Sequence, residues 1–158
     1  MPRLNIPHRM QRGSGYCLPA CIEMALAYIG IQRDQNDLAR QIGVIGNVGV
    51  AISRVMRVAG SNIQVFWKSG EESDLLQALA QNVPPIVAVD TRQLPYWTEA
   101  TTHVVLLAGV EDDIGGDPLK RVATVHDPAF PKPISVTMGD LMLAWDDMEN
   151  YFAMIQQK

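Results

Sequence analysis

The run from Tyr16 to Ile29 places the tightest constraint on the fold of this chain. It is almost wholly apolar, with Glu23 its only charge, and it is too long for a typical strand. A helix that is apolar on all sides is buried, so the run predicts a central helix, with Gly30 as its C-cap. Pro19 lacks an N–H group and is tolerated only in the first turn, so the helix must begin within a residue or two of Cys17.

The rest of the chain divides into a helical half and a strand-rich half. Amphipathic stretches at about residues 35–42, 50–59 and 73–81 predict helices, the last starting with a Ser/Asp capping signal. After Pro84-Pro85 come short runs rich in Val, Ile and Leu, typical of strands, with one further helix at about 139–147. The predicted strands are 86–89, 103–110, 122–125, 134–136 and 151–155. This order predicts an α+β domain in which an N-terminal helical half packs on a mostly antiparallel β-sheet.

Composition narrows the class of protein. The 158 residues contain no repeat, low-complexity tract or linker, so we expect one domain over 1–158. With 13 Lys and Arg against 17 Asp and Glu, the net charge is -4, which gives no basic footprint for nucleic acid. No apolar run reaches the roughly 18 residues of a membrane span, and the N-terminus lacks the apolar stretch of a signal peptide. We therefore expect a cytoplasmic protein.

Two cysteines lie near the start of the central helix. Cys17 is at its positive end, where the macrodipole and unpaired backbone N–H groups favour a thiolate, which is a nucleophile near neutral pH. Cys21 lies one turn deeper and is expected to pack in the core. Residues four apart on a helix rarely have disulfide geometry, so both are predicted to be free thiols. A Cys-x₃-Cys spacing within one helix is also unusual for zinc, and no metal or cofactor is predicted.

A thiol nucleophile usually works with a base and with a residue that orients the base. The runs 103–110 and 121–126 flank a loop with Gly115-Gly116 at its centre, which predicts an antiparallel hairpin. If paired residue numbers sum to about 231, His103 and Asp127 lie within about a residue of facing each other, near enough for a hydrogen bond. Strand alternation points His126 away from Asp127, toward the surface or a supporting role. His8 lies in an irregular N-terminal arm.

Taken together, these residues resemble the papain-like cysteine peptidases, and most closely the bacteriocin-processing, double-glycine leader peptidase domains. The matching stretches are Gln11 to Cys21, Thr102 to Leu106 and His126 to Ala129. The resemblance implies that Cys17 attacks a peptide carbonyl, His103 moves its proton and Asp127 holds the imidazole. It further implies an oxyanion hole made by the Gln11 amide and the Cys17 backbone N–H.

Two departures from the family leave alternatives open. Leu18 stands where the family usually has Gly, and it would narrow the cleft or alter the backbone near the thiol. The leader peptidases commonly belong to large exporters, so cleavage after Gly-Gly is not simply carried over, and an unknown protein partner stays open. The alternatives to a peptidase or amidase are an acyltransferase with the same triad and a non-catalytic peptide-binding module. Tyr96 and Trp97, in a cleft loop at 91–102 that could move, are given no site role.

Overall fold

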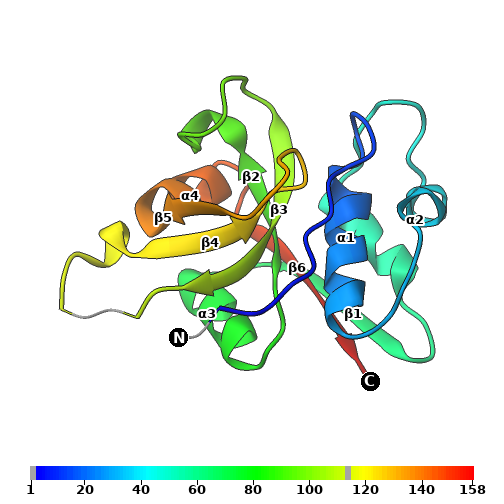
Figure 1. Cartoon of the computed structure of the whole chain (residues 1–158), viewed down its shortest axis with the longest axis horizontal. Coiled ribbons are helices and arrows are strands. Elements are labelled where there is room, and N and C mark those ends of the chain that lie inside the picture. The colour runs from blue at the N-terminus through cyan, green and yellow to red at the C-terminus, as the bar shows by residue number, and fades with distance from the viewer. Residues whose placement is uncertain (1–2, 113–114) are drawn as a thin grey trace.

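The computed structural model describes residues 3–112 and 115–158, and within them six strands form one antiparallel sheet (Figure 1). The strand order is β1-β6-β2-β3-β4-β5. The strands are β1 (Ile63–Ser69), β2 (Ile86–Asp90), β3 (Thr102–Val110), β4 (Val122–His126), β5 (Ile134–Thr137) and β6 (Tyr151–Gln157). The helices are α1 (Cys17–Tyr28), α2 (Gln35–Ile42), α3 (Glu72–Ala80) and α4 (Met138–Asp146), with short 3₁₀ helices η1 (Ile52–Val58), η2 (Thr91–Gln93) and η3 (Pro118–Lys120). In Figure 1, α1 and α2 lie together on one side of the sheet, and α3 and α4 lie apart from them.

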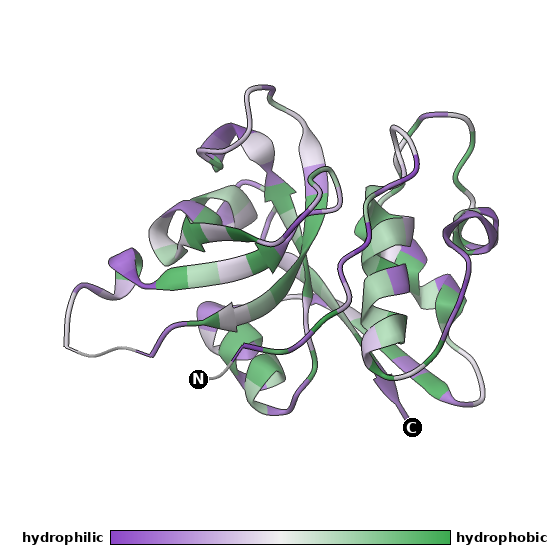
Figure 2. Cartoon of the chain, viewed as in Figure 1, coloured by the Kyte–Doolittle hydropathy of each residue, from purple (hydrophilic) through white to green (hydrophobic). Residues whose placement is uncertain are grey.

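The central helix forms where the sequence predicts it. α1 begins at Cys17, with Pro19 in its first turn, and Gly30 follows its end with a φ of 85°. That positive φ is the left-handed conformation that glycine adopts most readily after a helix. One side of α1 packs on β3, and α2 and η1 cover other sides, so its apolar side chains are buried as expected. Figure 2 shows the same contrast, with apolar residues on α1 and the middle strands and a mostly hydrophilic α2.

Three elements differ from the sequence prediction. Residues 50–59 form the 3₁₀ helix η1 instead of an amphipathic α-helix. The strand β1 was not predicted, because its side chains become exposed toward its C-terminal end and, among the residues described, it pairs with β6 alone, at the edge of the sheet. α3 starts at Glu72 with Glu71 as its N-cap, and Asp74 takes part as the third helical residue, accepting from the Glu71 N–H at 2.8 Å. The N-cap is therefore Glu71, two residues before the Ser73 that the sequence predicted.

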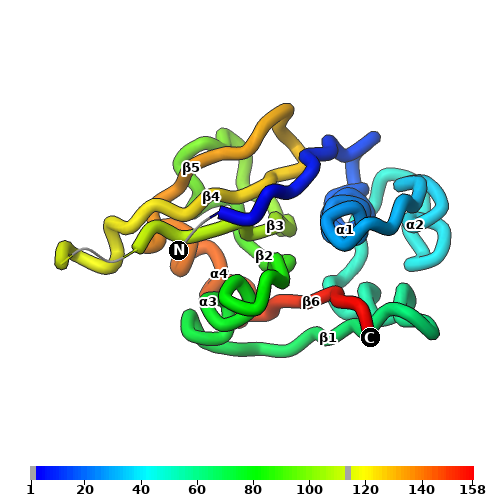
Figure 3. The backbone as a smooth tube through the Cα atoms, turned by 60° about the horizontal axis from the view of Figure 1, so that its bottom comes forward, coloured from blue at the N-terminus to red at the C-terminus, as the bar shows by residue number. Residues whose placement is uncertain are grey.

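The N-terminal arm joins the two halves of the molecule. Its Leu4 N–H donates to the β3 residue Ala108 at 2.9 Å, and its Gln11 N–H donates to Pro128 after β4 at 2.7 Å. Figure 3 shows the arm passing from β3 and β4 to the start of α1. The chain segments before α1 and after β4 therefore meet at the same end of the sheet.

The β3–β4 hairpin confirms the antiparallel pairing but shifts its register. Leu106 pairs with His126 and Leu107 with Val125, so paired numbers sum to 232, and a bulge follows between Leu107 and Gly109. Gly115 has a φ of 93° in the connecting loop, while residues 113–114 of that loop lie outside the described part. Among the described residues, no helix is both long and apolar enough to cross a membrane.

Candidate active site

Cys17 stands at the floor of an open cleft. It is the first residue of α1, half-buried, and no described side chain caps the backbone N–H groups of that first turn. The cleft has a volume of about 830 Å³ and is lined by Gln11, Cys17 and His103 together with residues 47–53 and the aromatic side chains Trp67, Trp97 and Tyr151. The thiol is thus accessible at the positive end of a helix, as the position of Pro19 predicts.

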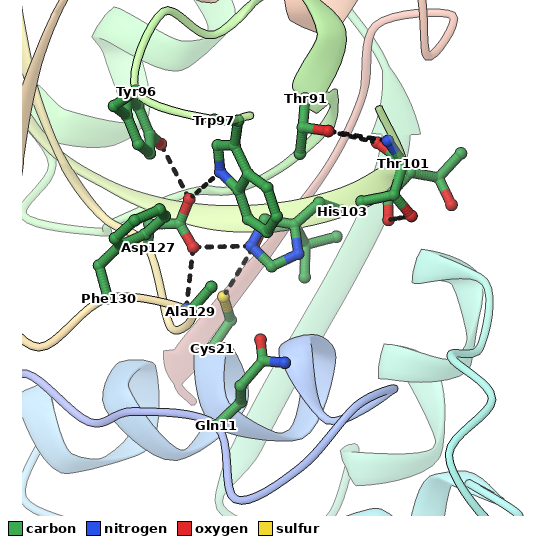
Figure 4. Close-up of polar contacts among 12 residues, drawn as sticks. Gln11, Cys21, Thr91, Tyr96, Trp97, Thr101, His103, Asp127, Ala129 and Phe130 are labelled. Atoms are coloured by element: carbon green, nitrogen blue, oxygen red, sulfur yellow. Dashed lines mark hydrogen bonds and ion pairs between the residues drawn. The ribbon is translucent and has the colours of Figure 1, made fainter. Parts of the chain in front are cut away.

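His103 and Asp127 meet at the end of the β3–β4 hairpin. His103 Nε2 lies 2.7 Å from Asp127 Oδ1, and the two residues are 6% and 0% exposed (Figure 4). One step beyond the last pair, the observed register places Asp127 opposite Val105. Residues 103 and 105 share a face of a strand, so the contact is diagonal instead of direct. The predicted pair is therefore in contact, although paired residue numbers in the hairpin sum to 232 instead of the expected 231 or so.

The His103 ring also lines the same cleft as Cys17, whose side chain acts on it. Because Nε2 is bonded to Asp127, Nδ1 is the ring nitrogen left for the thiol. Burial would lower the pKa of His103, but the hydrogen bonds and charges of Asp127 and Cys17 outweigh it and raise the pKa to about 9. Burial would likewise raise the pKa of Asp127, and its bonds with His103, the Ala129 N–H and Trp97 lower it instead. The geometry favours an imidazolium beside a carboxylate.

Asp127 has further partners that the sequence analysis missed. Tyr96 Oη and Trp97 Nε1 both donate to Asp127 Oδ2, at 2.9 and 2.8 Å, and the Ala129 N–H donates to Oδ1 at 3.0 Å. Tyr96 and Trp97 precede His103 closely in the chain, but their partner lies thirty residues further on. Two adjacent aromatic residues, each with a polar donor, were the available signal in the sequence. They were given no site role because aromatic rings are equally typical of the core.

Gln11 lies on the arm beside the start of α1. Its backbone N–H is fixed to Pro128 and its Nε2 donates to Gly13 O at 3.1 Å. In Figure 4 its side chain points from the arm toward the His103–Asp127 pair. Its buried Oε1 has no hydrogen-bond partner among the described residues. Since an amide nitrogen carries two hydrogens, one N–H of Gln11 is left for a ligand in the cleft.

The other highlighted residues lie outside this group. Cys21 is fully buried, with its S–H directed at Val104 O at 3.7 Å, and burial followed by the charges of Cys17 and Asp127 raises its pKa well above the usual range. Leu18 is 1% exposed within the core and is not among the cleft-lining residues, so the expectation that it narrows the cleft is wrong. α1 turns this side chain toward the core, away from the cleft that Cys17 faces.

His126 is not a surface residue, because it is 3% exposed. It does point away from Asp127, and its Nδ1 lies 3.0 Å from His8 Nδ1 in the arm. Burial, and then the electrostatic influence of His8 and Arg3, lower the pKa of His126 to about 4. Within residues 3–112 and 115–158, no group of three or more His, Cys, Asp and Glu side chains is arranged to hold a metal ion.

Comparison with solved structures gives the same fold for three peptidase domains. A double glycine motif protease from an AMS/PCAT transporter, solved in complex with the leader peptide, has a TM-score of 0.71 at 17% identity, over 99% of this chain and 94% of its own. A putative C39-like peptidase from Bacillus anthracis also has a TM-score of 0.71 at 17% identity, over 100% and 99%. The peptidase domain of Streptococcus ComA, a bi-functional ABC transporter involved in a quorum sensing pathway, has 0.72 at 12% identity, over 98% and 99%.

The family assignment comes from the sequence. No curated protein matches the chain. A family model described as Peptidase_C39 like, however, matches residues 3–153, which span both the arm and the last strand. This agrees with the resemblance to double-glycine leader peptidase domains and with the mixed helix and antiparallel sheet architecture. The chain therefore belongs to the Peptidase_C39 like family.

Proposed function

We propose that this protein is a cysteine peptidase or amidase that cleaves a peptide bond through a thioester at Cys17. One observation carries the proposal: Cys17 and His103 line the same open cleft, and Nε2 of His103 is held at 2.7 Å by the buried Asp127. A nucleophile, a base and a residue that orients the base are the parts that covalent acyl transfer requires. Packing alone gives no reason for this arrangement.

The chemistry follows from the positions of these groups. Cys17 Sγ attacks the carbonyl carbon with its proton already held by His103 as an imidazolium, which Asp127 stabilises. His103 then gives that proton to the departing amine as the C–N bond breaks, leaving an acyl thioester. A water molecule, deprotonated by His103, attacks the thioester. The products are a carboxylic acid and the restored thiol.

Gln11 and the Cys17 backbone N–H would stabilise the oxygen that gains charge during each attack. The Cys17 N–H belongs to the first turn of α1, where an N–H has no partner within the helix. The second N–H of the Gln11 amide is available because the first is taken by Gly13 O. One such donor typically contributes a factor of 10² to 10³ to the rate. We propose this pair as the oxyanion hole.

The cleft indicates the kind of chain it takes. None of the described residues that line it is Asp, Glu, Lys or Arg. Apart from the His103 imidazolium, the lining gives a charged substrate side chain no opposite charge to offset the water that it loses there. We therefore propose an uncharged segment of a peptide or protein at the scissile bond. A leader peptide, as bound by the double glycine motif protease, is such a candidate.

The test is cleavage of a peptide library, followed by mass spectrometry, with Cys17→Ala and the matched control Cys21→Ala. We expect Cys17→Ala to abolish turnover and Cys21→Ala to retain it, because Cys21 has no access to the cleft. Unchanged turnover by Cys17→Ala would contradict the proposal. Products joined to an added amine would identify an acyltransferase, and peptide binding without thiol reactivity would identify a binding module. The cytoplasmic location expected from the sequence stays a prediction.

A further inference from the structure

The Asp127 carboxylate accepts more hydrogen bonds than the orientation of one histidine requires. It is 0% exposed, and the described part of the chain supplies it with two donors on each oxygen. His103 and the Ala129 N–H bond to Oδ1, whereas Tyr96 and Trp97 bond to Oδ2. A buried carboxylate without partners would take up a proton. This set of bonds keeps it charged and prevents its rotation.

The two donors on Oδ2 come from one closed loop. Its base is fastened by Thr91, which is 1% exposed: the Thr91 N–H donates to Thr101 O at 3.0 Å, and Thr91 Oγ1 accepts from the Thr101 N–H at 2.8 Å. The same hydroxyl lies 2.7 Å from Glu99 O. Figure 4 shows this fastening beside the aromatic pair. These hydrogen bonds join the two ends of the loop.

Trp97 also contacts the other member of the pair. Its ring meets the His103 ring edge-on, with centroids 4.9 Å apart and an interplanar angle of 64°. Phe130 supports both donors from behind, at 5.5 Å from the Trp97 ring and 5.2 Å from the Tyr96 ring. Trp97 therefore fixes the plane of the imidazole by contact and the carboxylate by a hydrogen bond.

We propose that Tyr96 and Trp97 are positioning residues that hold Asp127 as an anion aimed at His103 Nε2, an inference that rests on the proposed function. With Oδ2 occupied by two neutral donors, only Oδ1 is directed at the imidazole, so the Nε2 proton stays on His103. Burial and the Asp127 charge raise the pKa of Tyr96, so its phenol remains a donor throughout the working range. Loss of either donor favours the neutral acid, which no longer stabilises the imidazolium.

The titratable groups around Asp127 determine which protonation steps appear in a pH profile of Cys17 reactivity. His103 faces it from β3, Tyr96 from the loop and Cys21 from α1, while Cys17 acts on it through His103. His126, the preceding residue, is directed instead at His8. Cys21 is buried and stays a thiol. The decrease in Cys17 reactivity at low pH, which is the acid limb of its pH profile, therefore depends on His103 and Asp127.

The experiment measures Cys17 alkylation from pH 4 to 10 in Tyr96→Phe, Trp97→Phe and the double variant. Tyr96→Phe removes only the donor, whereas Trp97→Phe removes the donor together with part of the ring and keeps an aromatic side chain. Loss of a hydrogen bond to a charged group corresponds to about one pH unit, so we expect the acid limb to move up by about that amount in each single variant. The matched controls are Tyr28→Phe and Trp145→Phe, which remove the same groups elsewhere, the latter a bond to Tyr151 O.

The outcomes separate this inference from the proposed function. If Tyr96→Phe and Trp97→Phe lower the melting temperature as the controls do but leave the acid limb in place, the two residues only pack and the inference is wrong. If His103→Ala itself leaves the profile unchanged, the proposed function fails, and the inference fails with it. A shifted limb with a lowered kcat and a nearly constant KM supports both.

Discussion

Leu18→Ala tests the assignment of this side chain to the core. Leu18 is 1% exposed among the buried residues of α1, although it follows Cys17 directly in the chain. Removing a fully buried leucine side chain costs roughly 2–5 kcal/mol, through lost burial and the cavity left behind. For a domain of this size each 1 kcal/mol lowers the melting temperature by about 2–4 °C, so we expect a decrease of roughly 4–20 °C. Reactivity at Cys17 should be nearly unchanged well below that temperature.

The assay is thermal and urea unfolding followed by tryptophan fluorescence, together with Cys17 alkylation at low temperature. The matched control is Leu143→Ala on α4, because Leu143 is 56% exposed and should change stability by less than about 0.5 kcal/mol. A Leu18→Ala midpoint equal to that of Leu143→Ala, with faster alkylation or cleavage, would refute the reasoning. It would mean that Leu18 stands in the cleft and that its removal widens it.

Further predictions concern the thiols, a loop glycine and a buried histidine. Native protein should be alkylated at Cys17 and, because burial raises its pKa, not at Cys21 up to pH 9, as peptide mapping would show; labelling of Cys21 without urea would contradict this. Gly15→Ala should lower stability by at least about 1–2 kcal/mol and cleavage by tenfold or more, since Gly15 has a φ of 81° and a Cβ there would lie 2.7 Å from the Val48 carbonyl carbon. His126 is held neutral with its pKa lowered to about 4, so stability should fall as pH decreases from about 6.5 to 4, by roughly 3 kcal/mol; melting curves of His126→Asn should lack this loss.

The elements that carry the site were predictable because local signals fix them. Pro19 sets the start of α1, so the position of Cys17 follows from one residue type and one steric rule. Strand alternation and an antiparallel hairpin bring His103 to Asp127 even with a register error of one unit. A diagonal pair two residues apart still shares a face, which is why the contact survives that error.

The remaining parts depend on contacts between distant segments. β1 is an edge strand that pairs, within the described part of the chain, with β6 alone, at the far end of the sequence, and its exposed residues hide the alternation that marks a strand. The bonds of Tyr96 and Trp97 to Asp127 depend on how the loop closes at Thr91. Leu18 was misplaced because the sequence alone does not say which side of α1 faces the core at its first turn. These are properties of tertiary packing.

The segment at 126–130 links the two halves of the proposed machinery. It supplies Asp127 to His103, and its Pro128 O fixes the backbone of Gln11. Its Phe130 O lies 2.6 Å from His8 Nε2, which must donate, so His8 Nδ1 is left to accept from the Nδ1–H of His126 at 3.0 Å. The proposed oxyanion donor and the carboxylate that orients the base are thereby tied to one short segment, whereas the nucleophile comes from α1. Because Gln11 reaches α1 through only a few intervening residues, the arm is the covalent connection that aligns the nucleophile with the other groups.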